Sequence, residues 1–409
     1  MDWSQVTALT IPEGNVKQVS ANGVVLWKKR PSPSDYTQLE YIESTGTQWI
    51  DTGIANWNNT LEYEIKLSIE QQSEIKTYFG SYDVWSTSKN NVPNISTWTS
   101  YRVASNFRAG FSSNSGTDIG IRNGQTGTIS FKGNTISWSE GSSLSFDRGY
   151  DFTVPTSIYL FAQHAGNSVT ECATTKIYYA KFWLNGELVR NLIPAMRNSD
   201  SKVGMRDTVT GQFFTNAGTG EFIAGPRFVE YIEFDGNSWI DTGFTQQTCR
   251  IECGVEFINH NNNNAVQLMG FHVSTAGFWG IKFRGSMFYP YLNVNSYQYN
   301  DVILNLDTTD TKKPVLTLTI GDTTSSPVVG TTVRPKTTYV MGGIKSGSTI
   351  SYNNFMKVYY NRIYNVNNEL IQDLRPCLDP NNVACMYDMV TGTYFYNQGT
   401  GEFQYGGIL

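Results

Sequence analysis

The sequence predicts an all-β protein that contains two copies of one domain. The first observation is a repeat, because the segment Tyr41–Gly53 returns as Tyr231–Gly243, 190 positions later. The second is composition: 24 Tyr, 22 Phe and many Thr, Asn and Gly residues suit strands and turns. The third is a strict alternation of apolar and polar residues over short stretches, which is typical of half-buried strands.

Residues 1–30 are predicted to form a small separate module. Asn22-Gly23 lies between two apolar runs, and this dipeptide is the strongest short-range signal for a β-hairpin. A module of this size buries too little surface to be stable alone, so we expect it to dock on a partner. The residues expected to make that assembly contact are Val16, Val19, Val24, Leu26 and Trp27.

The rest of the chain divides into a linker and two repeats. Residues 31–35 contain two prolines and predict a short stiff linker. The first repeat is predicted over 36–226 and the second over 227–409. Each is long enough to bury a core of its own.

Within each repeat the pattern predicts about a dozen short strands. Leu61–Ile69 alternates strictly, and Ile251–Phe257 follows it at the same offset of 190. Gly127–Trp138 predicts a hairpin that turns at Gly133-Asn134. Only Leu188–Asn191 and its counterpart Leu370–Asp373 leave room for a helical turn. The pattern as a whole predicts a β-sandwich or a barrel.

A second block repeats near the end of each copy. Asp207–Gly211 with Asn216–Phe222 returns as Asp388–Gly392 with Asn397–Phe403, shifted by 181. Together with Tyr41–Gly53 and Tyr231–Gly243, these ends resemble the concanavalin A-like, laminin-G-like jelly-roll superfamily over 36–226 and 227–407. The resemblance implies two tandem jelly-roll β-sandwiches in which the first strand lies near the last ones.

The leading segment Leu9–Trp27 resembles N-terminal segments of bacteriophage structural proteins. The combined resemblance implies a non-enzymatic virion surface protein, such as a head fibre, a capsid decoration protein or a tail-fibre component, that contacts host glycans. We therefore expect virion localisation after assembly in the host cytoplasm, contact with other virion proteins through the N-terminal module, and a homo-oligomer, with a trimer favoured. The alternatives are a bacterial cell-surface carbohydrate-binding adhesin and, third, a glycan-active jelly-roll hydrolase.

Composition argues against several other classes. Net charge is −5, charged residues make up 16% and no run of five like charges occurs, so we expect no nucleic-acid partner. No apolar run reaches the length of a membrane span, so we expect no membrane insertion. The first residues have neither the basic region nor the apolar core of a secretory signal.

The repeated Trp-Ile-Asp-Thr-Gly string allows two interpretations. Asp51 and Asp241 are candidate calcium ligands, because carboxylates are the usual donors for this ion. The alternative, which we favour, is that the tryptophan packs in the sandwich and the aspartate fixes a turn through hydrogen bonds to the backbone. We therefore expect no cofactor, with calcium as the weak alternative, and we interpret the Asp-x-Val-Thr-Gly turns structurally as well.

Candidate glycan-binding residues are aromatic, because sugar rings stack on aromatic faces. They are sought in the variable middle of each repeat, where loops on a rigid scaffold carry recognition. The alternative for each one is ordinary strand packing. The candidates are Trp85, Trp98, Tyr101 and Trp138 in the first repeat and Trp279, Tyr289, Tyr291, Tyr297 and Tyr299 in the second.

The five cysteines and the acidic residues give no catalytic signature. The cysteine count is odd, and three histidines without ligand spacing do not indicate zinc. We expect the cysteines to be small buried or half-buried residues rather than a disulfide framework. Glu233 and Asp235 match only part of the carboxylate pattern that a jelly-roll glucanase needs, since the final glutamate is missing. We therefore expect no enzyme activity.

Overall fold

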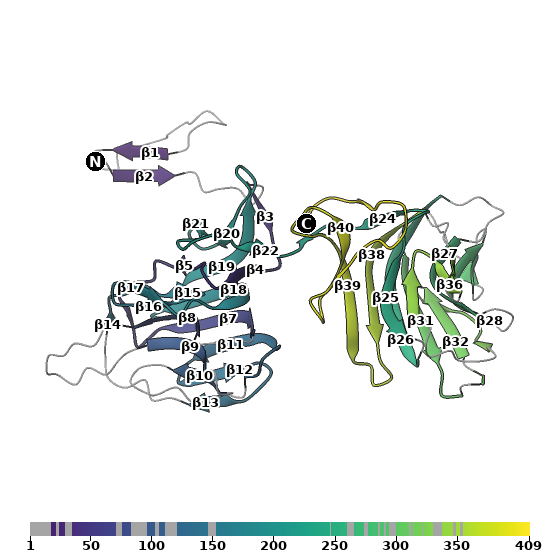
Figure 1. Ribbon diagram of the computed structural model, residues 1–409, viewed down its shortest axis with the longest axis horizontal. Helices are drawn as coiled ribbons and strands as arrows, with labels where there is room; N and C mark the ends of the chain where they lie inside the picture. The colour runs from purple at the N-terminus through teal and green to yellow at the C-terminus, as the bar shows by residue number, and fades with distance from the viewer. Residues whose placement is uncertain are drawn as a thin grey trace. The chain divides into compact units, whose positions relative to one another are not determined.

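The computed structural model is all-β and forms two tandem jelly-roll β-sandwiches preceded by a small hairpin (Figure 1). It describes residues 18–21, 24–28, 35–70, 76–82, 96–102, 106–110, 121–145, 153–245, 247–259, 266–273, 277–284, 287–289, 292–293, 300–310, 312–313, 315–320, 322–329, 338–346, 349–351 and 355–409. By their internal contacts the residues fall into two compact units, Met1–Ala224 and Gly225–Leu409.

The predicted N-terminal hairpin is present. Strands β1 (Gln18–Ala21) and β2 (Val24–Lys28) pair antiparallel, with Ala21 opposite Val24 and Val19 opposite Trp27. Among the described strands, the two pair only with each other. The hairpin is therefore a separate two-stranded sheet, as expected from its size.

The first unit has a large and a small sheet. The large sheet runs β13-β12-β11-β7-β18-β19-β20-β21, with β3 on β19, β4 on β18 and β22 on β4, and the small sheet runs β10-β9-β8-β15-β5, with β16 on β8 and β17 on β16. Strands β14 and β6 pair separately. The bounds are β3 Tyr36–Gln38, β4 Ile42–Thr45, β5 Ile50–Asp51, β6 Trp57–Asn58, β7 Glu62–Ser68, β8 Lys76–Tyr82, β9 Ser96–Arg102, β10 Asn106–Gly110, β11 Thr126–Lys132, β12 Thr135–Trp138, β13 Ser143–Ser145, β14 Thr153–Val154, β15 Tyr159–Leu160, β16 Gln163–Ala165, β17 Ser168–Thr170, β18 Thr174–Leu184, β19 Glu187–Arg197, β20 Lys202–Asp207, β21 Phe213–Thr215 and β22 Ile223–Ala224.

The second unit repeats this plan. Its large sheet runs β33-β32-β31-β26-β38-β39-β40-β41, with β23 on β39, β24 on β38, β42 on β24 and β34 on β32, and its small sheet runs β25-β35-β27-β28-β29-β30, with β36 on β27 and β37 on β36. The bounds are β23 Arg227–Phe228, β24 Ile232–Asp235, β25 Ile240–Thr245, β26 Cys249–Asn259, β27 Val266–Val273, β28 Gly277–Arg284, β29 Met287–Tyr289, β30 Leu292–Asn293, β31 Asn300–Asp307, β32 Val315–Ile320, β33 Thr323–Thr324, β34 Val328–Val329, β35 Thr338–Met341, β36 Ile344–Ser346, β37 Thr349–Ser351, β38 Phe355–Tyr364, β39 Leu370–Leu378, β40 Ala384–Asp388, β41 Tyr394–Phe395 and β42 Gln404–Tyr405.

Register shows which residues of the two units correspond. One run of paired residues joins Asp207, Leu192, Ala180 and Ile65, and its counterpart joins Asp388, Leu374, Asn361 and Cys253. Ile65 therefore corresponds to Cys253, an offset of 188 rather than the expected 190. The expected offset was therefore wrong by two residues. The buried face was still predicted correctly, because side chains along a strand alternate between its two faces with a period of two.

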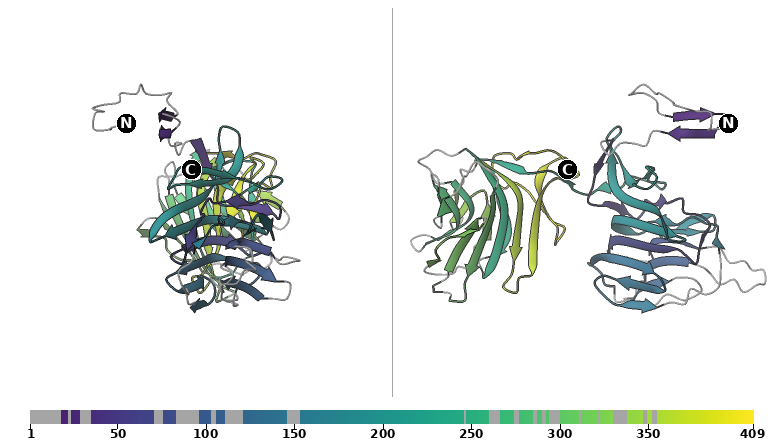
Figure 2. Two further views of the ribbon diagram at one scale, coloured as in Figure 1. Left: turned by 90° about the vertical axis from the view of Figure 1, so that its left-hand side faces the viewer. Right: turned by 180° about the vertical axis from the view of Figure 1, so that it is seen from behind.

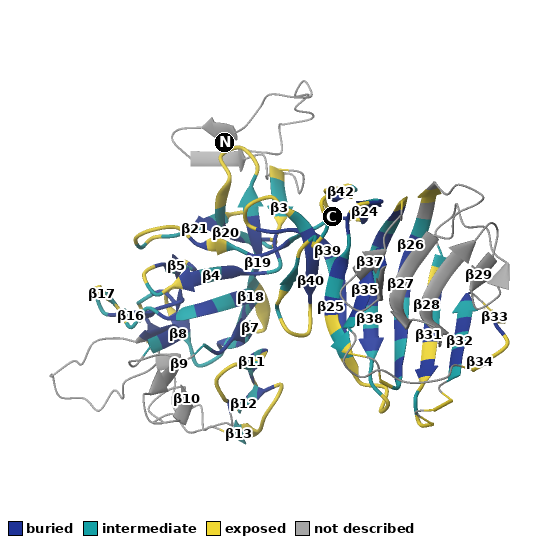
Figure 3. Ribbon diagram, turned by 45° about the vertical axis from the view of Figure 1, so that its right-hand side comes forward, coloured by how far each residue is buried: buried dark blue, intermediate teal, exposed yellow. Residues whose placement is uncertain are grey.

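Each unit encloses its own hydrophobic core between its two sheets (Figure 3). In the first unit Tyr63 of β7 contacts Phe79 of β8 edge to face, with ring centroids 5.0 Å apart. In the second, the Tyr339 hydroxyl of β35 donates across the layers to Asn361 Oδ1 of β38 at 3.4 Å. Figure 2 shows the layers of the second unit from behind.

One expectation about local structure was wrong. Leu188–Asn191 and Leu370–Asp373 are not helical turns, because they lie in the long strands β19 and β39. Leu188–Asn191 pairs with β18 and Leu370–Asp373 pairs with β38, and this pairing fixes both segments in the extended conformation. No described helix is long and apolar enough to cross a membrane.

The repeated Asp-x-Val-Thr-Gly strings are structural, as interpreted from the sequence. Asp388 is 1% exposed, and its Oδ1 accepts hydrogen bonds from the backbone N–H groups of Asp373 at 2.9 Å and Val390 at 3.1 Å. Its Oδ2 accepts from Thr391 Oγ1 at 2.7 Å. Asp207, fully buried, makes the same contacts with Asn191, Val209 and Thr210. Each carboxylate therefore fixes the turn that follows β20 or β40 and ties this turn to the neighbouring strand β19 or β39.

We expect Asp388→Ala to lower the free energy of unfolding of the second unit by about 2–4 kcal/mol, because it leaves two backbone N–H groups without their acceptor. Urea titration or calorimetry measures this change. Asp388→Asn keeps one acceptor oxygen and should cost less than half as much, and Asp207→Ala should affect the first unit only. An unchanged stability in Asp388→Ala would show that the carboxylate is dispensable.

Candidate functional site

The Trp-Ile-Asp-Thr-Gly strings serve turns and packing. Asp51 Oδ1 accepts from the Gly53 N–H at 2.9 Å, and Asp241 Oδ1 accepts from the Gly243 N–H at 3.0 Å. Asp241 Oδ2 also accepts from Thr338 Oγ1 at 2.8 Å. In the described part of the chain, no three His, Cys, Asp or Glu side chains are placed to hold a metal ion together. The two aspartates are therefore described as turn residues.

Trp49 belongs to a stack of rings in the first unit. Its ring stacks on Tyr159 with centroids 4.3 Å apart, and Tyr159 stacks on His164 at 4.0 Å. Tyr159 is 7% exposed, so the stack packs on the body of the unit. Partial burial and the nearby Asp51 carboxylate raise the pKa of Tyr159.

The glycan-binding assignment of Trp138 was wrong. Its side chain is 2% exposed and belongs to the hydrophobic core of the first unit. Trp138 lies opposite Ile129 in the β11–β12 hairpin, and strict alternation turns both residues to the inner face. No face of its ring is free to stack on a sugar.

The other aromatic candidates remain predictions. Trp98 and Tyr101 lie in β9, Trp279 in β28 and Tyr289 in β29, all in the small sheets, and the structure describes their backbone only. The same holds for Val19, Val24, Leu26 and Trp27 in the hairpin. The candidates Trp85, Tyr291, Tyr297, Tyr299 and Val16 lie outside the described residues.

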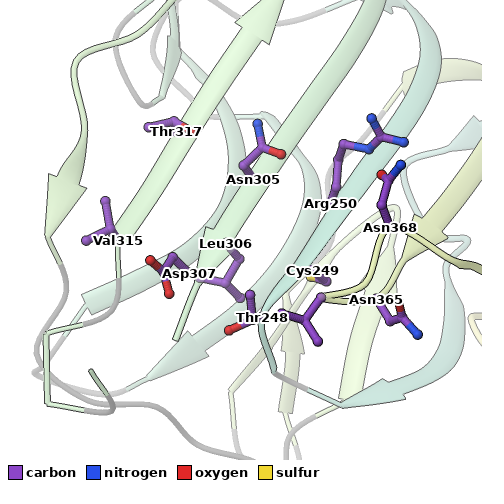
Figure 4. Close-up of a pocket in the computed structure, with 11 residues that line it drawn as sticks. Thr248, Cys249, Arg250, Asn305, Leu306, Asp307, Val315, Thr317, Asn365 and Asn368 are labelled. Carbon is purple, nitrogen blue, oxygen red and sulfur yellow. The ribbon is translucent and has the colours of Figure 1, made fainter. Parts of the chain in front are cut away.

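A pocket that the sequence reasoning missed lies in the second unit, at one end of three neighbouring strands of its large sheet (Figure 4). Its volume is about 480 Å³, within the usual range for ligand pockets. It is formed by strands β26, β31 and β32 and the turn after β38. The lining residues are Thr248, Cys249, Arg250, Asn305, Leu306, Asp307, Val315, Thr317, Asn365, Val366 and Asn368.

Strand register places three polar residues of the pocket in one row. Arg250 pairs with Asn305, and Asn305 pairs with Thr317, so the three stand side by side across adjacent strands. The neighbours Leu306 and Leu316 are buried in the core, and alternation therefore turns the row outward. Asn368, from the turn after β38, lies beside Arg250 (Figure 4).

The guanidinium of Arg250 is held in place by its neighbours. It lies 4.1 Å above the centroid of the Tyr364 ring, and its Nη2 is 3.4 Å from Glu252 Oε1. Glu252 Oε2 also accepts a hydrogen bond from the Tyr364 hydroxyl at 3.2 Å. The Nε of Arg250 is buried and has no hydrogen-bond partner within the described residues. The guanidinium is thus oriented while part of its donor capacity is unused.

The remaining polar groups of the pocket fall into two sets. Asn365 is committed to its own turn, since its Oδ1 accepts from the N–H groups of Asn367 and Glu369 at 2.9 and 3.0 Å. By contrast, the side chains of Asn305, Thr317 and Asn368 hydrogen-bond to no other described residue. These three side chains line the pocket beside Arg250 and have hydrogen-bonding groups without a partner in the described part of the chain.

The corresponding positions of the first unit form no such row of available groups. Glu62 and Lys132 correspond to Arg250 and Asn305 by register. Glu62 Oε1 accepts from the Gly133 N–H at 2.8 Å, and Lys132 Nζ donates to Glu64 Oε2 at 2.9 Å. The polar groups available to a ligand therefore distinguish the second unit.

The pocket contains one charged carboxylate and one protonated thiol. Hydrogen bonds from Thr309 lower the pKa of the Asp307 carboxyl, which is therefore a charged acceptor at neutral pH. Burial raises the pKa of the Cys249 thiol to about 12, so it is protonated and unreactive there. The pocket thus offers a cation, amides, hydroxyls and a carboxylate, beside the exposed apolar side chain of Val366.

No family model and no curated protein matches the chain. Among solved structures, it is similar to the LG4-5 domains of the mouse laminin alpha1 chain, with 9% identity over 98% of this chain and 99% of that chain and a TM-score of 0.30. It is also similar to a Bacteroides ovatus protein provisionally described as carbohydrate-binding, with 10% identity over 63% of this chain and 76% of that chain and a TM-score of 0.32. At these scores the description of the fold rests on the strand pairing.

Proposed function

We propose that the chain is a non-enzymatic carbohydrate-binding protein whose ligand occupies the pocket of the second sandwich. The observation that carries the proposal is the row Arg250–Asn305–Thr317, completed by Asn368. Sugar hydroxyls are both donors and acceptors, and amide, hydroxyl and guanidinium groups match them. The row stands on paired strands, which hold the groups in fixed positions.

Binding is favoured over hydrolysis because Asp235, which matches part of the carboxylate pattern of a jelly-roll glucanase, is not suited to donate a proton. Partial burial alone would raise the pKa of Asp235. Hydrogen bonds from the N–H groups of Asn237 and Glu402 outweigh this effect and lower the pKa. A general acid needs the opposite shift. Asp235 thus holds the turn before Ser238 and is a poor proton donor.

We expect Asn305→Ala to weaken glycan binding at least about tenfold, which is ~1.4 kcal/mol, because Asn305 is an exposed pocket residue whose amide would contact the sugar. Arg250→Ala should weaken binding further. The measurement is binding of the full chain to an array of bacterial surface polysaccharides, followed by titration calorimetry with the best one.

Lys132→Ala is the matched control, because Lys132 occupies the position of Asn305 in the first unit. It should leave binding unchanged. Melting temperatures within a few degrees of the original would show that all three variants are folded. Full binding by both Asn305→Ala and Arg250→Ala would place the glycan site elsewhere, and the absence of any bound glycan would contradict the proposed function.

The finer proposal is that these sandwiches are displayed on a bacteriophage particle, as a head fibre, decoration or tail-fibre component. It is supported by the resemblance of Leu9–Trp27 to phage structural proteins and by the separate pairing of β1 with β2. Several copies on one particle would gain avidity from weak contacts. Light scattering tests the expected trimer, whose mass would be near three times 45.8 kDa.

Deletion of residues 1–30 tests the anchoring role of the hairpin. We expect the shortened chain to remain folded and soluble, because β1 and β2 pair with no other described strand, yet to be missing from purified particles. Circular dichroism and the protein content of particles measure the two results. Normal incorporation would reject the hairpin as anchor, and a bacterial adhesin would then be the better alternative.

A further inference from the structure

Two cysteines of the second unit face each other across neighbouring strands. Cys377 lies in β39 and Cys385 in β40, which are neighbouring strands (Figure 1). The two residues are directly paired in the antiparallel ladder. Both side chains are 0% exposed, and their Sγ atoms are 3.5 Å apart as free thiols. Neither lines the pocket.

The backbone geometry suits a covalent bond between them. Directly opposed residues of antiparallel strands have Cα atoms about 4.5–5.5 Å apart, and disulfides span about 4.4–6.8 Å. A disulfide bond length of ~2.05 Å requires the two sulfurs to approach by roughly 1.5 Å. Side-chain rotation supplies most of this movement, so the strands need not separate in the product.

We propose that Cys377 and Cys385 are a modification site at which oxidation forms an intramolecular disulfide. The oxidant is a small-molecule disulfide such as oxidised glutathione. One thiolate attacks it, forming a mixed disulfide and releasing one thiolate of the oxidant; the second cysteine thiolate then displaces the other. In sum, two protein thiols become one disulfide, and the oxidant disulfide becomes two thiols. The proposal does not depend on the glycan pocket.

Access controls when this reaction occurs. Hydrogen bonding to Cys385 and burial raise the pKa of the Cys377 thiol, so few thiolates exist in the closed hairpin. The exposed turn after Asp379 joins the two strands, and it is fixed because Asp379 Oδ1 accepts from the N–H groups of Asn381 and Val383 at 2.8 Å each. Tyr396 donates to Asp379 Oδ2 at 3.0 Å. Opening of this turn would expose both thiols together.

The first unit lacks the pair and has no space for it. The corresponding residues are Ala195 and Gly204, which are paired in the same way. A side chain at Gly204 would meet the backbone oxygen of Phe214. The facing cysteines are therefore particular to the second unit and are not a requirement of the shared fold.

The test is refolding of the full chain from urea in a buffer of oxidised and reduced glutathione, which removes the barrier of burial. Free thiols are then alkylated under denaturing conditions, and peptides are mapped by mass. We expect Cys377 and Cys385 to be linked, while Cys249 and Cys253 are alkylated. The oxidised chain should melt several degrees higher than the same chain after reduction.

The variant Cys385→Ala removes the partner and serves as the control. It should show no rise in melting temperature on oxidation, whereas Cys172→Ala should retain the full rise. Two alkylated thiols at Cys377 and Cys385 after oxidative refolding, or linkage of either one to a different cysteine, would overturn the proposal. A linked pair that lowers the melting temperature would contradict the claim that the paired strands accommodate the bond.

Discussion

Each sandwich depends on one polar contact between the beginning and the end of its own repeat. In the first unit Asn216 Oδ1 accepts from the N–H groups of Trp49 at 3.1 Å and Gly218 at 2.7 Å. In the second, Asn397 Oδ1 accepts from Trp239 at 3.1 Å and Gly399 at 2.8 Å. The backbone adds Ala217 N–H to Trp49 oxygen at 2.9 Å and Gln398 N–H to Trp239 oxygen at 2.8 Å. We call this set of bonds the closing contact.

The closing contact explains why the two ends of each repeat recur together. Strand β22 pairs with β4, and β42 pairs with β24, so the last strand lies beside one of the first in both units. Gly399 must be glycine, because a side chain there would meet the Asn237 backbone oxygen, and Gly218 has the same relation to Thr47. The two ends of each repeat are needed for the closing contact. The features particular to the second unit, which are the pocket and the facing cysteines, lie in the sequence between these two ends.

Much of the fold was predictable because its signals are local. Alternation in Leu61–Ile69 and the turn at Gly133-Asn134 specified β7 and the β11–β12 hairpin. The helical turn predicted at Leu188–Asn191 was wrong, since the segment alone does not reveal that it will pair with β18. Trp138 was misassigned for a related reason: alternation placed it in a strand, but its inner position depends on which face the other sheet covers.

The candidate site was largely beyond sequence reasoning. Arg250, Asn305 and Thr317 are single polar residues in three strands, and only their register brings them together. The cysteine pair carried a weak signal, because Asp379-Pro-Asn-Asn between Cys377 and Cys385 is rich in turn residues and suggests a hairpin.

The most direct test of this account is native-state hydrogen exchange of the full chain carrying Asn397→Ala. If the closing contact holds the second sandwich together, the slowest amides of β26 and β38 should exchange faster by the factor that corresponds to the lost free energy of unfolding, while those of β7 and β18 keep their rates. Faster exchange confined to Trp239 and Gly399, with β26 and β38 unchanged, would show that the contact only fastens a local end and would contradict the account.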